Sequence, residues 1–286
     1  MIRYAGQEKF VKLDGSRICY IDEGEGPPLL FLHGIGGSIS NWAPNIEHFK
    51  RRYRVIALDL PGFGKSGYVD ADYGLEFHAR AIRGLLAHLG VDRVSIVGNS
   101  LGGLITLHIA LYHNELVETI TLVDNAGGHK FPVLIRRALK VLPLKWLKRI
   151  ILFITSYMIR FRFAYRLGGI YEINRYTRAL LDEAVSTARR PDVDRYLEAY
   201  VRTARTALDV TYQERLGEIC KPTLIVWGQK DLGLPLKVGQ RINTAIKGSF
   251  LVAIPRAAHV PQLDQPEAFN AALDRFLTGA LKCLVP

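Results

Sequence analysis

Short apolar runs alternate with longer amphipathic stretches along the first 125 residues of the chain. The short runs are rich in Val, Ile and Leu, as in buried strands, whereas apolar residues that recur every three or four positions are typical of helices. This pattern predicts strands at 10–13, 17–21, 28–32, 53–58, 94–97 and 119–123, and helices at 74–89 and 101–113. Such an order is typical of a mainly parallel sheet covered by helices.

The alternation stops after the sixth strand and resumes near residue 216, with strands predicted at 223–227 and 249–254 and helices at 236–245 and 266–277. The stretch between the two halves is rich in helix formers, arginine and aromatic residues and contains no convincing strand. We therefore predict an α/β fold whose mainly parallel, eight-stranded sheet is flanked by helices. Its parts are a first core segment, 1–125, a helical cap or lid, 126–215, inserted after the sixth strand, and a second core segment, 216–286.

The positive charge of the chain is concentrated in the predicted cap. The net charge is +11, and residues 130–215 contain 18 Lys and Arg against 8 Asp and Glu, a difference of +10. A basic segment inserted into a nearly neutral core favours peripheral contact with an anionic membrane. We expect no nucleic-acid partner, and the oligomeric state stays open.

The N-terminal residues lack an apolar run followed by a small-residue cleavage site, so we expect a cytoplasmic protein, in part at the membrane periphery. The cysteines Cys19, Cys220 and Cys283 form no C-x-x-C pair. Neither a disulfide framework nor a metal site is therefore expected.

Ser100 is the candidate nucleophile. It lies in the sequence GNSLG, which follows the predicted strand VSIVG and precedes a predicted helix, the context of a nucleophile elbow. Small residues two positions on either side of a serine allow the strand and the helix to approach closely at a strained turn. The pattern therefore indicates a reactive serine.

A serine hydroxyl needs a neighbouring base, and that base is itself oriented by an acid. With a nucleophile elbow the chain order is serine, acid, histidine, and His259 is the only histidine after residue 129. Asp231, just beyond a predicted strand end, is the favoured acid. Asp124, which follows another strand end, is its rival.

Reaction at a carbonyl also needs N–H donors for the oxyanion. The turn HGIGGS follows the strand PPLLF, and the backbone N–H groups of Ile35 and Leu101 are our candidates. In this turn we expect His33 to brace the loop rather than to act as the base.

Two glycine-rich segments resemble nucleotide-binding loops but lack a required residue. The segment GFGKS would need a glycine where Asp59 stands, and the glycines of HGIGG would need a further one at Ile39. Nucleotide binding is not supported, and we expect no cofactor.

Together, the stretches HGIGGS, DLPGFGKS, GNSLGG, WGQKD and AAHVPQLDQPEAF resemble the α/β-hydrolase superfamily across essentially the whole chain, most of all its capped esterases and monoacylglycerol-lipase-like members. The resemblance implies a cofactor-free hydrolase with Ser100, Asp231 and His259 as its triad. The superfamily's dehalogenases and epoxide hydrolases carry an aspartate where this chain has Ser100. Its carbon–carbon bond hydrolases typically carry a tryptophan where Val260 stands.

We accordingly expect a carboxylesterase or lipase that cleaves small-molecule esters through an acyl-enzyme on Ser100, with medium-chain acyl esters or monoacylglycerols favoured. The alternative is a carbon–carbon bond hydrolase of the meta-cleavage product type, on the same triad. The third hypothesis is a non-catalytic binding protein with the same fold, because a fold does not determine a function.

One predicted cap helix is apolar nearly all round. Its broad apolar face is predicted from Leu147, Ile150, Ile151, Ile154, Tyr157, Met158 and Phe161, whereas Leu152 and Phe153 fall on the opposite side among Lys145, Lys148, Arg149, Ser156 and Arg160. Either both faces pack inside the cap or against a partner subunit, or the helix lines an acyl-chain tunnel and rests on a lipid surface. The run 150–159 is too short to span a bilayer, which takes about 20 residues.

Overall fold

The computed structural model describes residues 7–128, 132–160, 165 and 169–280. Its sheet consists of β1 (Lys9–Leu13), β2 (Ser16–Glu23), β3 (Pro28–Leu32), β4 (Arg54–Leu58), β5 (Val94–Asn99), β6 (Val117–Val123), β7 (Thr223–Gly228) and β8 (Phe250–Ile254). The eight strands lie in the order β1-β2-β4-β3-β5-β6-β7-β8. The pairs β1/β2 and β2/β4 are antiparallel and the rest are parallel, which confirms the predicted mainly parallel, eight-stranded sheet.

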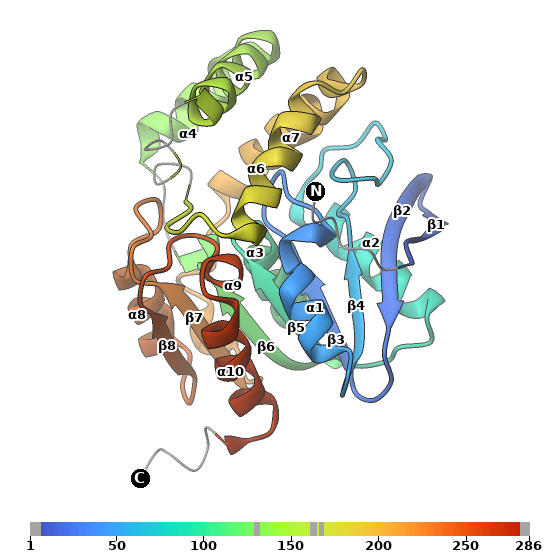
Figure 1. Ribbon diagram of the computed structural model, residues 1–286, viewed down its shortest axis with the longest axis vertical. Coiled ribbons are helices and arrows are strands. Elements are labelled where there is room, and N and C mark those ends of the chain that lie inside the picture. Colours follow the sequence, from blue (N-terminus) through green and yellow to red (C-terminus); the bar gives the residue numbers. More distant parts are fainter. Residues whose placement is uncertain (1–6, 129–131, 161–164, 166–168, 281–286) are drawn as a thin grey trace.

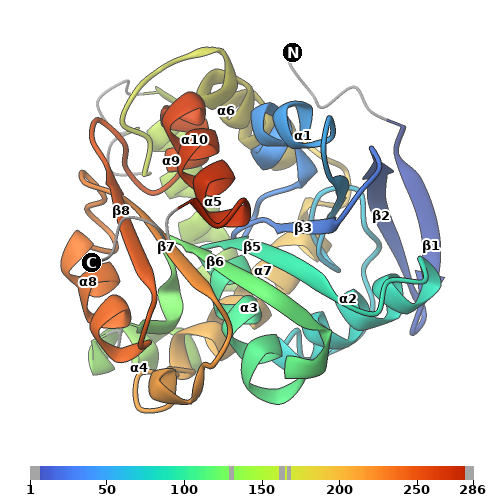
Figure 2. The same ribbon diagram turned by 90° about the horizontal axis from the view of Figure 1, so that it is seen from below.

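Helices cover both faces of the sheet (Figure 2). One face carries α2 (Leu75–His88), α3 (Leu101–Tyr112) and α8 (Leu236–Ala245), and the other carries α1 (Ala43–Phe49) and α10 (Pro266–Leu277), preceded by α9 (Pro261–Asp264). Alternate side chains of each strand enter the two cores: in β3, Leu30 packs toward the first group of helices and Phe31 toward the second. Burial on both faces explains why the strands appear as continuous apolar runs.

The sequence pattern located most core elements to within a few residues but missed the four-residue helix α9 and the helix α1. This helix has only seven residues, with Pro44 in its first turn, and two turns are too few for a helical period to be recognised. It is held by burial of Ile46 and Phe49 against the sheet. Similarly, β2 runs to Glu23, beyond the predicted end, because Glu23 pairs with Val55 of β4.

Among the described residues between β6 and β7 there are four further α-helices, which we call the inserted helices. They are α4 (Val133–Val141), α5 (Leu144–Arg160), α6 (Arg175–Ala188) and α7 (Val193–Asp209). Helix α5 packs against α6 and α7, and α4 packs against α7. Figure 1 shows α4 and α5 at the top of the molecule, farther from the strands than α6 and α7.

The predicted apolar face of α5 needs one correction. Leu147 is buried and Ile151 is half-buried, as expected, but Ile150 is exposed. The helix rests on its neighbours through the side that carries Leu147 and Ile151, and Ile150 is turned away from that contact. Of the two residues predicted on the opposite side, Phe153 is exposed, whereas Leu152 is half-buried and faces the same internal cavity as Ile151. The side chains of Ile154, Tyr157, Met158 and Phe161, which belong to the same prediction, lie outside the described residues, as do those of Ser156 and Arg160.

In the part of the chain that the structure describes, no helix combines the length and the apolar character needed to cross a membrane.

Candidate active site

Ser100 lies at the sharp turn between β5 and α3, with φ 55° and ψ −110°, a conformation that non-glycine residues rarely adopt. A Cβ on Gly98 would lie 2.4 Å from the Gly102 carbonyl group, and one on Gly102 would lie 2.3 Å from the carbonyl oxygen of Leu32. Both contacts are too short for any side chain. Glycines are therefore required here so that the helix can approach the sheet and hold the serine in its strained turn.

The structure joins His259 to Asp231. His259 Nδ1 lies 2.7 Å from Asp231 Oδ2, and these residues follow β8 and β7, at the carboxyl edge of the sheet. The other carboxylate oxygen of Asp231 accepts hydrogen bonds from the N–H groups of Gly233 and Leu234. Burial alone would raise the pKa of Asp231, but the hydrogen bond and charge of His259 hold it below its ordinary value. An ionised carboxylate in this position fixes the imidazole ring and its tautomer.

Asp124, the rival acid, is fully buried at the end of β6 and accepts a hydrogen bond from the N–H group of Gly228 at 3.1 Å. Burial, together with the nearby negative charge of Asp231, raises the pKa of Asp124 well above its ordinary value. A neutral Asp124 can donate its proton to the Asp231 carboxylate, with which it is hydrogen-bonded. Asp124 thus supports Asp231, while the imidazole is bonded to Asp231.

The loops that carry Ser100 and His259 are linked by Asn99, which the sequence analysis missed. Its side-chain amide donates to the carbonyl oxygens of His259, at 3.0 Å, and Val123, at 3.2 Å. The N–H group of His259 in turn donates to the carbonyl oxygen of Gly169, at 2.9 Å. The residue before the serine therefore positions the histidine backbone, and its place in GNSLG was the available signal.

The predicted oxyanion loop lies beside the serine. A Cβ on Gly34 would lie 3.3 Å from the Ser100 Cβ, so Ile35 follows directly after a residue within contact distance of Ser100. Leu101 is the first residue of α3, where backbone N–H groups have no acceptor within the helix. The two predicted oxyanion donors, the N–H groups of Ile35 and Leu101, thus belong to two different segments that meet at Ser100.

His33 braces this loop. With the tautomer that these contacts require, its Nδ1–H donates to the Gly34 carbonyl oxygen at 2.7 Å, and its Nε2 accepts from the N–H group of Leu60 at 2.9 Å. Burial lowers the pKa of His33 to about 4, so the ring is neutral at pH 7. Tyr196 of α7 donates to the carbonyl oxygen of Gly36, at 3.2 Å, so the inserted helices also hold the loop.

Asp59 explains the glycine-rich segment that imitates a phosphate-binding loop. Its carboxylate accepts hydrogen bonds from the N–H groups of Ile39 and Lys65, each at 2.7 Å. A Cβ on Gly64 would lie 2.2 Å from that carboxyl group. The glycine therefore makes room for a buried aspartate that ties this segment to the oxyanion loop.

Asp264 was also missed. Its carboxylate accepts the N–H groups of Ala258, next to His259, and of Tyr171 and Glu172, which precede α6. It therefore connects the histidine loop to the inserted segment. Burial raises the pKa of Asp264 to about 6, although the three backbone N–H groups act in the opposite direction.

We expect Asp264→Asn to lower the free energy of unfolding by about 1–3 kcal/mol, because an amide N–H would face backbone N–H donors. We also expect a lower kcat. The folded protein retains a proton on Asp264 that the unfolded chain releases, so the stability advantage of the wild type over the variant should shrink as the pH rises from about 4 through about 6. Urea unfolding at several pH values measures this. Asp274→Asn, on α10, is the control, and equal effects of both substitutions would contradict the role of Asp264.

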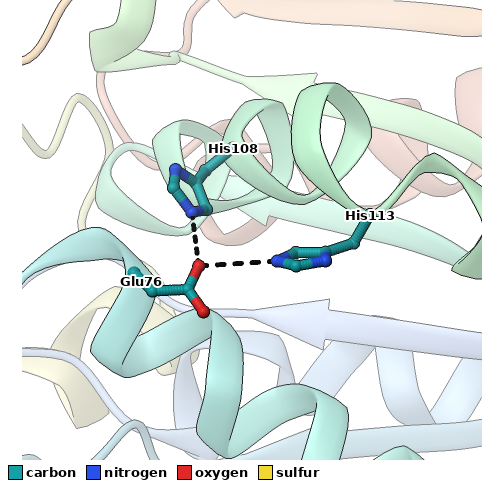
Figure 3. Close-up of side chains that lie close together, drawn as sticks. All are labelled: Glu76, His108 and His113. Carbon is teal, nitrogen blue, oxygen red and sulfur yellow. Dashed lines mark hydrogen bonds and ion pairs between the residues drawn. The ribbon is translucent and has the colours of Figure 1, made fainter.

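Two groups of side chains among the described residues have the composition of metal ligands. One is Asp124, Asp231 and His259, in which the hydrogen bonds above already use the donor atoms. The other is Glu76 of α2 with His108 and His113 at the end of α3 (Figure 3).

In this second group Glu76 Oε2 lies 2.9 Å from His108 Nε2 and 3.4 Å from His113 Nε2 (Figure 3). Arg83 Nη1 lies 3.2 Å from His113 Nε2 and 3.5 Å from Glu76 Oε1. A guanidinium group at this distance occupies the carboxylate oxygen and imidazole nitrogen that a metal cation would need as ligands. We therefore interpret the group as a polar network that links α2 to α3.

An apolar cavity of about 120 Å³ lies between the oxyanion loop and the inserted helices. Gly36 and Gly37 form one wall. The other described lining residues belong to three of the inserted helices: Ile151, Leu152, Leu180, Glu183, Ala184, Thr187, Ala188, Val193, Tyr196, Leu197 and Tyr200. A more polar cavity of about 260 Å³ adjoins it at Gly36 and includes Lys65 and Arg190.

The comparisons with known proteins agree with this architecture. The family model described as alpha/beta hydrolase fold matches residues 27–266. A curated relative, the 2-hydroxy-6-oxononadienedioate/2-hydroxy-6-oxononatrienedioate hydrolase of Paraburkholderia phymatum, is 30% identical over 287 residues, covering 96% of each chain.

Two solved structures are similar over most of the chain. A probable hydrolytic enzyme of Pseudomonas aeruginosa PAO1 has a TM-score of 0.84 and 25% identity, covering 96% of this chain and 95% of the other. A membrane phospholipase A, described as a bacterial virulence factor, has a TM-score of 0.72 and 26% identity, covering 96% and 86%. The chain therefore belongs to the alpha/beta hydrolase fold family and is a hydrolase.

Proposed function

We propose that this hydrolase cleaves carboxylic esters, with Ser100 as nucleophile, His259 as base and Asp231 as the acid that orients His259. The observation that carries the proposal is the 2.7 Å hydrogen bond between His259 and Asp231, in a loop that Asn99 ties to the strained serine turn. A positioned serine, base and orienting acid are the parts that acyl transfer needs.

In the reaction, His259 takes the hydroxyl proton as Ser100 Oγ attacks the ester carbonyl carbon, and the oxyanion receives hydrogen bonds from the N–H groups of Ile35 and Leu101. The tetrahedral intermediate collapses to an acyl-enzyme when His259 returns the proton to the departing alcohol. Water, deprotonated by His259, then attacks the acyl group and releases the acid and free Ser100.

The apolar cavity supports an acyl group as the part of the substrate that the inserted helices bind. A dry apolar cavity of about 150 Å³ accommodates benzene, so the observed volume of about 120 Å³ suits an acyl chain of a few carbon atoms. The membrane phospholipase A among the similar structures acts, by its name, on lipid esters.

Carbon–carbon bond hydrolysis is the second candidate, because the Paraburkholderia relative bears the name of such an enzyme. That name describes a dicarboxylate substrate, which calls for free cationic side chains near the site. The two cations of the adjoining cavity are already paired: Arg190 donates two hydrogen bonds to Asp192, and Lys65 is paired with Glu8. Val260 also stands where the carbon–carbon hydrolases typically have tryptophan. Both observations favour the ester.

Turnover of p-nitrophenyl esters, measured beside turnover of a 2-hydroxy-6-oxo-dienoate, tests the two candidates on one enzyme preparation. We expect a higher kcat/KM for the ester. A higher value for the dienoate would reverse the assignment while leaving the triad intact. Binding of either compound without turnover would indicate a non-catalytic binding protein instead.

The acyl-chain preference should follow the cavity. Each methylene that enters it contributes about 0.8 kcal/mol, so kcat/KM should rise roughly fourfold per methylene beyond acetyl until the cavity is full. Ala184→Phe, which adds a ring to the cavity wall, should move the optimum to shorter chains. A series of p-nitrophenyl esters measures both effects. An acetyl optimum in the wild type would contradict the proposed acyl site.

A further inference from the structure

The outer surface of α4 and α5 exposes an unusual number of large apolar side chains. Of the nine exposed large apolar residues among those the structure describes, six belong to these two helices: Val133, Leu134, Val141, Trp146, Ile150 and Phe153. We call these six residues the apolar stripe. Isolated exposed apolar residues are ordinary, but six of them on two consecutive helices indicate a surface that meets another apolar phase.

The stripe follows the helical period. On α5, Trp146, Ile150 and Phe153 are 50%, 44% and 72% exposed and stand at positions i, i+4 and i+7, which lie on one face. On α4, Leu134 and Val141, 79% and 81% exposed, stand seven residues apart and so share a face as well. Each helix therefore has an apolar outer face in addition to the side that packs on the protein.

Helices α4 and α5 carry only positive charges. Residues 133–160 contain seven Lys and Arg and no Asp or Glu. Three of the cations are paired with acids of α7: Arg136 and Lys140 with Asp209, and Lys148 with Asp194 and Glu198. These pairs link the inner side of α4 and α5 to α7.

Other cations remain on the outer side. Arg137, Lys145 and Arg149 are exposed, and the Arg149 guanidinium lies 5.5 Å from the centre of the Trp146 ring. Apolar side chains bordered by exposed cations fit the surface of an anionic bilayer. The apolar side chains can enter the region just below the headgroups, while the cations contact the lipid phosphates.

We propose that α4 and α5 dock on an anionic phospholipid bilayer through the apolar stripe, with the helices parallel to the membrane plane. The opposite side of α5 supplies Ile151 and Leu152 to the apolar cavity. One helix therefore lies between the bilayer and the cavity, so that an acyl ester delivered from the lipid would pass beside α5 to reach the cavity. Docking is independent of the reaction, whereas this delivery rests on the proposed ester hydrolysis.

The chain carries its own reporter for docking. Of its three tryptophans, Trp42 and Trp227 are fully buried and only Trp146 is exposed. Full-length protein with Ser100→Ala should show a blue shift of tryptophan emission on mixing with vesicles of phosphatidylcholine and phosphatidylglycerol, and brominated lipids should quench it. Pure phosphatidylcholine should bind several times more weakly, and high salt should weaken binding to the anionic vesicles by screening the charges.

Matched variants distinguish vesicle binding through the apolar stripe from nonspecific binding by any exposed apolar or basic residue. Leu134→Ser and Phe153→Ser should each weaken vesicle binding about tenfold, and Lys145→Glu severalfold. Phe10→Ser and Lys12→Glu, at exposed positions of β1, should leave it unchanged. Absence of a Trp146 signal, or equal losses in the β1 variants, would overturn the proposal. The proposal would also be overturned if the protein failed to bind vesicles and light scattering showed a dimer that the Phe153→Ser substitution dissociates.

Activity then tests the delivery step. The enzyme with Leu134→Ser and Phe153→Ser together should hydrolyse a soluble ester as the wild type does but lose most of its rate on a vesicle-borne monoacylglycerol. Equal rates on the vesicle substrate would refute delivery from the bilayer. If no ester of either kind is cleaved by the wild type, the proposed function fails, and the Trp146 signal still decides docking.

Discussion

Ser100→Ala should lower kcat for ester hydrolysis by about a millionfold, the scale seen when a triad nucleophile is removed. Without the hydroxyl group no acyl-enzyme can form, and the histidine and the oxyanion donors are left to act on water alone. The kcat of purified protein on its best p-nitrophenyl ester measures the loss. A fluorophosphonate probe should label the wild type and leave the variant unlabelled.

Two further variants serve as controls for this result. Ser95→Ala lies on the same strand, β5, and should keep full activity and labelling. Ser100→Gly should be as inactive as the alanine variant but more stable, because glycine adopts a positive φ without the strain that Ser100 carries at φ 55°. Activity retained in Ser100→Ala would remove the nucleophile assignment altogether.

Asp231→Asn should reduce kcat by about ten-thousandfold, as expected when an amide replaces the carboxylate of a triad. The amide would donate a hydrogen bond to His259 Nδ1, which now lies 2.7 Å from the carboxylate, and would thereby favour the wrong tautomer. Steady-state kinetics on the same ester, with the melting temperature recorded in parallel, distinguishes this catalytic loss from unfolding.

Asp124→Asn is the matched control, because both aspartates end neighbouring strands and contact each other. The amide oxygen of an asparagine can still accept the Gly228 N–H, and its N–H can still donate to Asp231. We expect most of the activity to remain. If Asp124→Asn were the more damaging change, the acid would belong on β6.

The local pattern of the chain determined the sheet and indicated the candidate nucleophile. Runs such as 28–32 are apolar throughout because both faces of a parallel sheet are buried, and this can be recognised without a structure. Ser100 was identifiable for a similar reason, since the glycines required by the close approach of β5 and α3 lie within two residues of it. His259 followed from the chain order alone.

Only the tertiary structure decided how these parts meet. Asp124 and Asp231 both follow strand ends, and their bonding partners differ because β7 lies next to β8, which leads to His259. The roles of Asn99 and Asp264 depend on hydrogen bonds between segments remote in sequence, for which a local pattern gives no signal. The outward direction of Ile150 likewise depends on which side of α5 rests on its neighbours. Sequence periodicity specifies the faces of a helix, whereas the packing of the other elements decides which of those faces is covered.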